Sequence, residues 1–84
     1  MKFIRFDDWR KLRGAEVEIW LDSALQRTGI IDEATEDSTM AWVAADSKEP
    51  RRLLERASGF ELRISFDELV LRAGPSTPQR NSDL

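Results

Sequence analysis

The feature that most constrains this chain is an alternation of apolar and polar side chains that occurs in two segments. Between Phe60 and Phe66 every second residue is aromatic or aliphatic, and the intervening residues are polar or charged. The segment from Glu16 to Leu21 alternates in a similar way. A period of two predicts strands with one buried face. In a chain of 84 residues, these strands imply one small β-rich domain with a thin core.

The residue types that are missing exclude several kinds of chemistry. The chain has no cysteine and no histidine. It therefore offers no disulfide framework, no thiolate metal site and no imidazole for proton transfer, and we expect no cofactor, no metal and no enzymatic activity. The amino terminus lacks the apolar core of a signal peptide, and no segment reaches the length of a membrane span. We expect a cytoplasmic location and no membrane partner.

Further elements follow from local patterns. Acidic residues precede a segment at residues 9–13, and a short helix there would place Trp9 and Leu12 on one face. Capping residues at 46–47, an inner face formed by Leu53, Leu54 and Ala57, and an end at Gly59 predict a second helix. The expected strands are 16–21, 27–31, 39–45, 60–66 and 69–71, within a single domain of residues 1–73 that a disordered tail of residues 74–84 follows.

Five short strands favour a sheet that curls on itself, because closure removes exposed strand edges. Gly29 is expected to allow a bulge or a bend in the second strand. Residues 39–45 are apolar on both faces, which predicts a central strand with Trp42 in the core. The expected fold class is therefore mainly β with two short helices, arranged as a five-stranded, partly open barrel of the SH3-like or Sm-like type.

Within residues 9–43, alternating apolar residues lead through a turn to a glycine and a further apolar residue, and this pattern resembles the first sequence motif of the Sm-like family. The resemblance implies a small barrel, and in that family it implies RNA binding and assembly into rings. The chain departs from the motif at Ala24 and Thr35, and no RNA-contacting residue transfers to it. Residues 42–46 and 51–61 also resemble short uncharacterised proteins of high-GC Gram-positive bacteria, which implies no activity. The apolar and glycine positions that match the Sm motif are Val17, Ile19, Leu21, Gly29 and Ile31.

Charge is segregated along the chain, whose net charge is −3. Residues 15–46 carry one basic and eight acidic side chains, whereas residues 47–64 carry five basic and three acidic ones. The arginines of the second segment would form a phosphate-binding face if they gathered on one side. The favoured alternative is that they pair with nearby carboxylates on a solvated surface. The arginines in question are Arg51, Arg52, Arg56 and Arg63.

A dense acidic group occupies residues 32–37. Oxygen-rich clusters of this kind hold calcium or magnesium in some proteins, but the spacing does not fit an EF-hand loop. We therefore favour a solvated hairpin turn over a metal site. The acidic residues are Asp32, Glu33, Glu36 and Asp37.

Trp20 is the residue of greatest functional interest, because the alternation places it on the face opposite Ile19. An exposed tryptophan there would be a hot spot for a partner, and the alternative is that a helix covers it. We expect a non-enzymatic module that binds a protein partner, or a second copy of itself, through Trp20 and the four arginines. RNA binding of the Sm-like kind is the alternative function.

Overall fold

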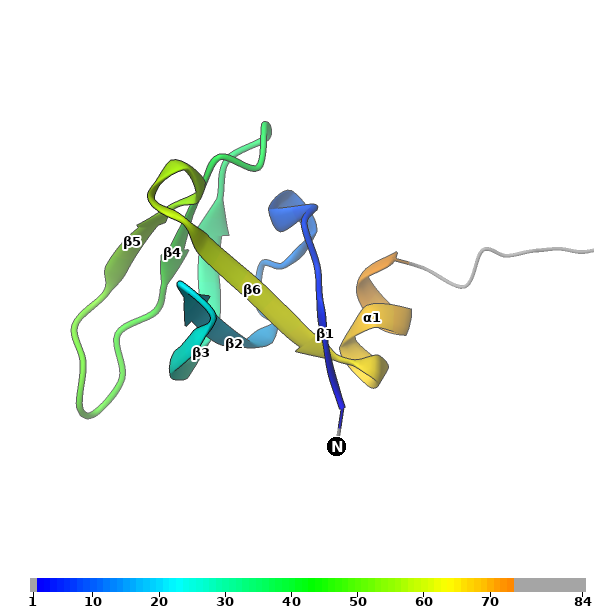
Figure 1. The fold of residues 1–84 in the computed structure, drawn as a ribbon, viewed down its shortest axis with the longest axis horizontal. Helices are drawn as coiled ribbons and strands as arrows, with labels where there is room; N and C mark the ends of the chain where they lie inside the picture. The colour runs from blue at the N-terminus through cyan, green and yellow to red at the C-terminus, as the bar shows by residue number, and fades with distance from the viewer. Residues whose placement is uncertain (1, 74–84) are drawn as a thin grey trace, which may run out of the picture.

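The computed structural model describes residues 2–73, which form a mainly-β domain with one six-stranded antiparallel sheet (Figure 1). Two 3-10 turns and one short α-helix accompany the sheet. The elements are β1 (Phe3–Arg5), η1 (Trp9–Lys11), β2 (Glu16–Leu21), β3 (Ala24–Ala34), β4 (Met40–Val43), β5 (Arg52–Glu55), η2 (Arg56–Ser58), β6 (Phe60–Ser65) and α1 (Phe66–Ala73).

The strands lie in the order β1-β6-β2-β3-β4-β5. Strand β6, the last strand in the sequence, pairs with β2. The first and last of the five strands β2 to β6 are therefore neighbours in the sheet. The long strand β3 pairs with β2 along its first part and with β4 along its last part. Register shifts at Ile19/Trp20 and at Ile31/Glu33 interrupt these two ladders. Such irregularities increase the local twist, which curls the sheet.

The turn between β2 and β3 is tight because two consecutive residues adopt left-handed backbone angles. Asp22 has a φ of 52° and Ser23 has a φ of 64°. Positive φ at both central residues is the geometry of a two-residue hairpin turn that matches the strand twist. This turn joins β2 directly to β3.

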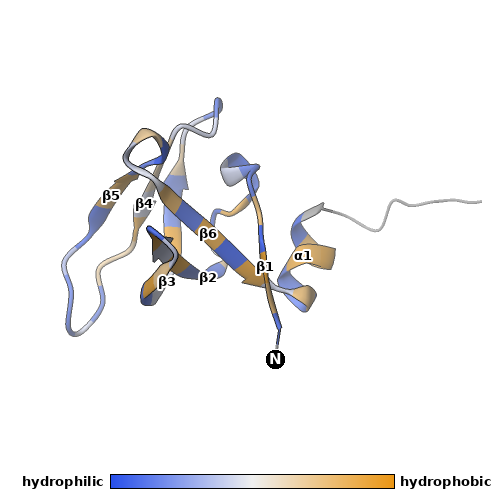
Figure 2. Cartoon of the chain, viewed as in Figure 1, coloured by the Kyte–Doolittle hydropathy of each residue, from blue (hydrophilic) through white to orange (hydrophobic). Residues whose placement is uncertain are grey.

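The core lies on the concave face of the sheet. The alternation of β6 is visible as bands of opposite hydropathy along the strand (Figure 2). Trp9 and Leu12, from η1 and the residue that follows it, are fully buried against the sheet, as their spacing predicted. The buried apolar residues are Trp9, Leu12, Ala15, Val17, Ile19, Ile31, Ala41, Val43, Leu54, Leu62 and Ile64.

Three sequence expectations about the sheet are wrong. The sheet has six strands rather than five: Phe3–Arg5 and Arg52–Glu55 are additional strands, and the strand expected at residues 69–71 does not form. Gly29 sits in regular pairing opposite Val17 and at no register shift. Gly29 instead allows the Val43 side chain to approach the backbone of β3 closely, since a Cβ atom at position 29 would lie 2.6 Å from Cγ1 of Val43. Trp42 is only half-buried, because the buried residues of β4 are its neighbours on the other face.

The second helix expected at residues 46–59 is replaced by strand β5 and the 3-10 turn η2. Leu54 faces the core, whereas Leu53 points outward and is 40% exposed, as alternation in a strand requires. Ala57 is also exposed, so the inner face expected for a helix does not form. Gly59 does end a turn, with a left-handed φ of 98°.

The last strand expected at residues 69–71 is wrong, because this segment lies in helix α1. The hydroxyl of Ser65 accepts a 3.2 Å hydrogen bond from the backbone N–H of Glu68, which caps the first turn of the helix. Glu68 in turn pairs with Arg72 at 3.1 Å, one helical turn later. Phe66, expected to face the core, begins this helix and is 60% exposed.

The tail expected at residues 74–84 lies outside the described residues. In the part of the chain that is described, none of the helices combines the length and apolar character that crossing a membrane requires.

Candidate functional site

Each of the four candidate arginines lies over a different aromatic ring. The distance from the guanidinium carbon to the ring centroid is 3.9–5.5 Å in all four cases. Stacking of this kind fixes the planar guanidinium on the ring and occupies one of its faces. The pairs are Arg51 on Trp42, Arg52 on Phe60, Arg56 on Trp9 and Arg63 on Trp20.

Two of the candidate residues, Trp20 and Arg63, contact each other directly, because the Arg63 guanidinium lies 3.9 Å from the centroid of the Trp20 ring. They lie on neighbouring strands β2 and β6, on the outer face of the sheet. The indole N–H of Trp20 donates to Glu18 at 3.0 Å, and Arg63 pairs with Glu61. Trp20 is half-buried under these side chains, and neither expected helix covers it.

Arg56 has a structural role. Besides stacking on Trp9, it donates a 2.7 Å hydrogen bond from Nε to the carbonyl of Ser38 and a second hydrogen bond to the carbonyl of Asp7. These contacts tie η2 to the β3–β4 turn and to the segment after β1. Arg51 is similarly engaged, through a 2.7 Å ion pair with Asp32.

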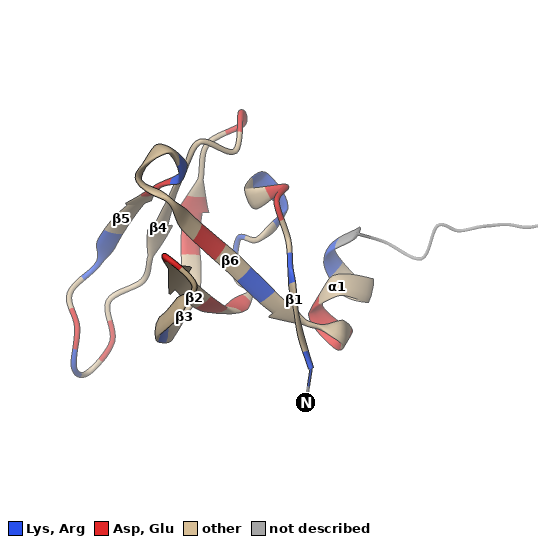
Figure 3. Ribbon diagram, viewed as in Figure 1, with Lys and Arg blue, Asp and Glu red and all other residues tan. Residues whose placement is uncertain are grey.

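The acidic group at residues 32–37 forms part of a hairpin turn. Asp37 accepts hydrogen bonds from the hydroxyls of Thr35 and Thr39 and from the Thr39 backbone. These hydrogen bonds lower the pKa of Asp37 below its ordinary value, and the one from the Thr39 hydroxyl has the largest effect. Among residues 2–73, no three potential ligands are grouped as a metal site. Charged side chains are spread over most elements (Figure 3).

The surface that sequence reasoning missed is the outer side of helix α1. Phe66, Val70 and Leu71 are 60%, 45% and 69% exposed. Residues 66 and 70 lie one turn apart on one side, whereas Leu69 packs against the core from the other side. We call these three exposed residues the α1 apolar surface. An exposed cluster of large apolar side chains on a short helix is typical of a binding surface.

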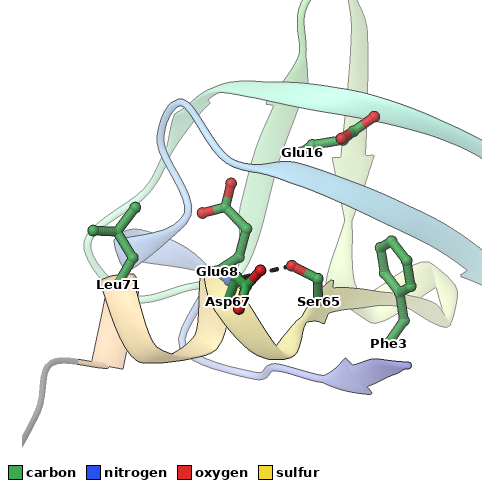
Figure 4. Close-up of a pocket in the computed structure, with 6 residues that line it drawn as sticks. All are labelled: Phe3, Glu16, Ser65, Asp67, Glu68 and Leu71. Atoms are coloured by element: carbon green, nitrogen blue, oxygen red, sulfur yellow. Dashed lines mark hydrogen bonds between the residues drawn. The ribbon is translucent and has the colours of Figure 1, made fainter. Parts of the chain in front are cut away.

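A pocket of about 250 Å³ adjoins this surface (Figure 4). Helix α1 supplies one wall, with Leu71 at its far end, and Phe3 of β1 closes the opposite side. Glu16, at the start of β2, faces the helix across the opening. The residues that line this α1 pocket are Phe3, Glu16, Ser65, Asp67, Glu68 and Leu71.

The α1 pocket combines apolar walls with negative charge. Its apolar walls are Phe3 and Leu71, and three carboxylates line the same opening. Glu68 is neutralised by Arg72. Glu16 and Asp67 have no cationic side chain within 4.0 Å in the described part of the chain. The site therefore favours an apolar group that is flanked by positive charge.

One sequence signal could have located this site. Ser65 followed three residues later by Glu68 is the spacing of a helix capping box, and apolar residues follow it directly. That signal competes with the alternation that runs from Phe60 to Phe66. The alternation is correct up to Ser65, where the strand ends.

Comparisons with known proteins give no match, whether with protein-family models, with curated proteins or with solved structures. The function must therefore be inferred from the geometry of this chain.

Proposed function

We propose that this protein is a non-enzymatic protein-binding module whose binding site is the α1 apolar surface together with the α1 pocket. The observation that carries the proposal is the exposure of Phe66, Val70 and Leu71 on one short helix. Covering these side chains would remove apolar area from water, which is the main favourable term in most protein association. The adjoining pocket would receive one side chain of the partner.

The proposed partner is a basic segment that carries an aliphatic or aromatic anchor side chain. The anchor would lie between Phe3 and Leu71, and lysines or arginines beside it would meet Glu16 and Asp67. Attraction between exposed charges speeds encounter and fixes orientation, and it weakens as salt rises.

We further propose that strands β2–β6 form a partly open barrel of the SH3-like type. The pairing of β6 with β2 supports this arrangement, because it joins the first and last strands of the run. Consecutive antiparallel pairing from β2 to β5 supports it as well. Between β5 and β6, where no ladder forms, η2 and the stacking of Arg52 on Phe60 span the gap.

Binding of RNA is the less favoured function. A nucleic-acid surface needs several cations free to meet phosphates on one side. Here Arg51 and Arg63 are paired with carboxylates, and Arg56 donates to backbone carbonyls. The net charge of −3 adds a general repulsion.

The proposed function is tested by selecting, from a library of displayed random peptides, those that bind the folded protein. We expect selected peptides to share an aliphatic or aromatic residue next to lysine or arginine. Their affinity should fall at least about tenfold for Leu71→Asp, which places a buried charge against the anchor. Leu53→Asp is the matched control, because Leu53 is also an exposed leucine but lies on β5. Its affinity for the peptides should equal that of the wild type.

Two outcomes would contradict the proposal. One is selection of no peptide, or of peptides that bind Leu71→Asp and Leu53→Asp equally well. The other is a dimer by light scattering that Leu71→Asp converts to a monomer, which would assign the α1 apolar surface to a second copy of the chain.

A further inference from the structure

A second cavity lies between β3, the β4–β5 loop and the start of β5. Its volume is about 580 Å³, and it is lined mainly by polar and charged side chains. The lining residues are Gln26, Arg27, Thr28, Asp46, Ser47, Lys48, Glu49 and Arg52. We call this cavity the β3–β5 pocket.

Arg27 forms the base of the β3–β5 pocket. It lies directly opposite Ile19 in the ladder, so it shares the face of the sheet on which Ile19 is buried. Its Nε donates to the carbonyl of Thr28 at 3.1 Å, and one terminal nitrogen pairs with Asp46 at 2.8 Å. The other terminal nitrogen, Nη1, is buried and has no hydrogen-bond partner among the described residues. A buried donor without an acceptor is costly.

Asp46 stabilises the β4–β5 loop through hydrogen bonds to its backbone. It accepts 2.8 Å hydrogen bonds from the backbone N–H groups of Lys48 and Glu49, besides pairing with Arg27. Hydrogen bonds from these N–H groups lower the pKa of Asp46 below its ordinary value, and the one from Lys48 has the largest effect. The charge of Asp46 is thus shared among three donors, and it fixes the wall of the pocket.

Two further cations of the pocket have no anionic partner. Neither Lys48 nor Arg52 has a carboxylate within 4.0 Å in the described part of the chain. Arg52 is nevertheless oriented, because its guanidinium lies 5.3 Å from the centroid of the Phe60 ring. Among the lining residues three cations face two carboxylates, those of Asp46 and Glu49, which leaves one positive charge in excess.

We propose that the β3–β5 pocket binds the phosphate or carboxylate group of a small ligand. Arg52 and Lys48 would contact the oxyanion, since a guanidinium fork matches its oxygen atoms. Thr28 and Ser47 line the same space, and their hydroxyls would supply neutral donors. An excess of one positive charge fits one oxyanion group, whereas Glu49 repels a polyanion such as RNA. This site is independent of the α1 pocket and of the function proposed for it.

Titrations with sodium phosphate and with sodium acetate test the proposal, each against sodium chloride of matched ionic strength. The Nε–Hε signals of Arg27 and Arg52 in ¹H–¹⁵N spectra report on the pocket. We expect saturable shifts of these signals, and Arg52→Gln should weaken binding at least about tenfold. Arg51→Gln is the matched control, because Arg51 is the adjacent arginine but its side chain pairs with Asp32 and stacks on Trp42 instead. Its affinity should be unchanged.

Each outcome has a defined meaning. Saturation by phosphate alone supports a phosphate-bearing ligand, and saturation by acetate alone supports a carboxylate-bearing one. Should Arg52→Gln perturb the fold, Lys48→Gln provides a second variant on the exposed loop and should also weaken binding. No saturable shift beyond that of chloride, or equal losses in Arg51→Gln and Arg52→Gln, would overturn the proposal.

Discussion

Substitution of Gly29 by alanine should destabilise the domain through a single close contact. Gly29 faces the core opposite Val17, and a Cβ atom there would lie 2.6 Å from Cγ1 of Val43. The φ of Gly29 is outside the left-handed region, so backbone strain does not contribute. Overpacking of a core by one methyl group costs about 1–3 kcal/mol. The contact joins β3 to β4 at the point where the sheet curls.

A second substitution isolates this contact. Val43→Ala removes Cγ1 and its sister methyl from a fully buried site and should cost about 2 kcal/mol alone. In the double variant, the new methyl at position 29 occupies part of the space that Cγ1 leaves. The double variant should therefore be about as stable as Val43→Ala, with a coupling free energy of about 1–3 kcal/mol.

Urea unfolding followed by tryptophan fluorescence measures these free energies, because Trp9 is fully buried in the native state. With a slope of about 1 kcal/mol per molar urea, each single substitution should lower the midpoint by about 1–3 M. Strictly additive losses in the double variant would refute the packing of Gly29 against Val43.

Three further predictions concern the elements around the sites. Leu54→Ala should cost about 2–5 kcal/mol and Leu53→Ala less than about 1 kcal/mol in urea unfolding, because only Leu54 is fully buried; equal losses would contradict strand β5. Ser65→Ala should lose about 0.5–2 kcal/mol and speed amide exchange in α1, because it removes the helix cap; unchanged exchange would contradict the cap. The lowered pKa of Asp37 means that its hydrogen bonds stabilise the fold above its ordinary pKa of 3.8 and are lost as pH falls through the lower folded value. Asp37→Asn should therefore make urea midpoints measured from pH 6 to pH 2 less sensitive to acid, and an unchanged pH profile would refute that role.

The best predicted parts of the fold were those with an unambiguous period. Alternation located β2 with the bounds that the structure shows, and it located β6 to within one residue. The spacing of Trp9 and Leu12 correctly indicated a shared buried face, although the turn there is a 3-10 turn rather than a longer helix. In both cases one face is apolar and the other polar, so a shift of register would expose the core.

The segment from Asp46 to Gly59 was predicted as a helix because its local signals agree with one, but it forms strand β5 and the turn η2. Adjacent leucines at positions 53 and 54 fit either a helix or a strand with one exposed face. Pairing of β5 with β4 decides the outcome, since Leu54 lies opposite Ala41 in the ladder. This long-range contact has no signature in the sequence of the segment itself.

The candidate site was predicted less well than the fold. Pairing with carboxylates was the favoured expectation for the four arginines, and it describes Arg51 and Arg63 but not Arg52 in the described part of the chain. Their stacking on four rings depends on which strands become neighbours. The α1 pocket exists because the chain turns from β6 into a helix at Ser65. Alternation through Phe66 concealed this change, and the capping signal at Ser65 and Glu68 was the only local indication.

The measurement that tests the proposed binding site most directly is a map of backbone amide shifts as a selected basic peptide is added to the ¹⁵N-labelled protein. The largest changes should centre on Phe3, Glu16, Asp67 and Leu71, and they should shrink as salt is raised. Changes centred instead on Trp20 and Arg63, on the outer face of β2 and β6, would contradict the assignment of binding to helix α1.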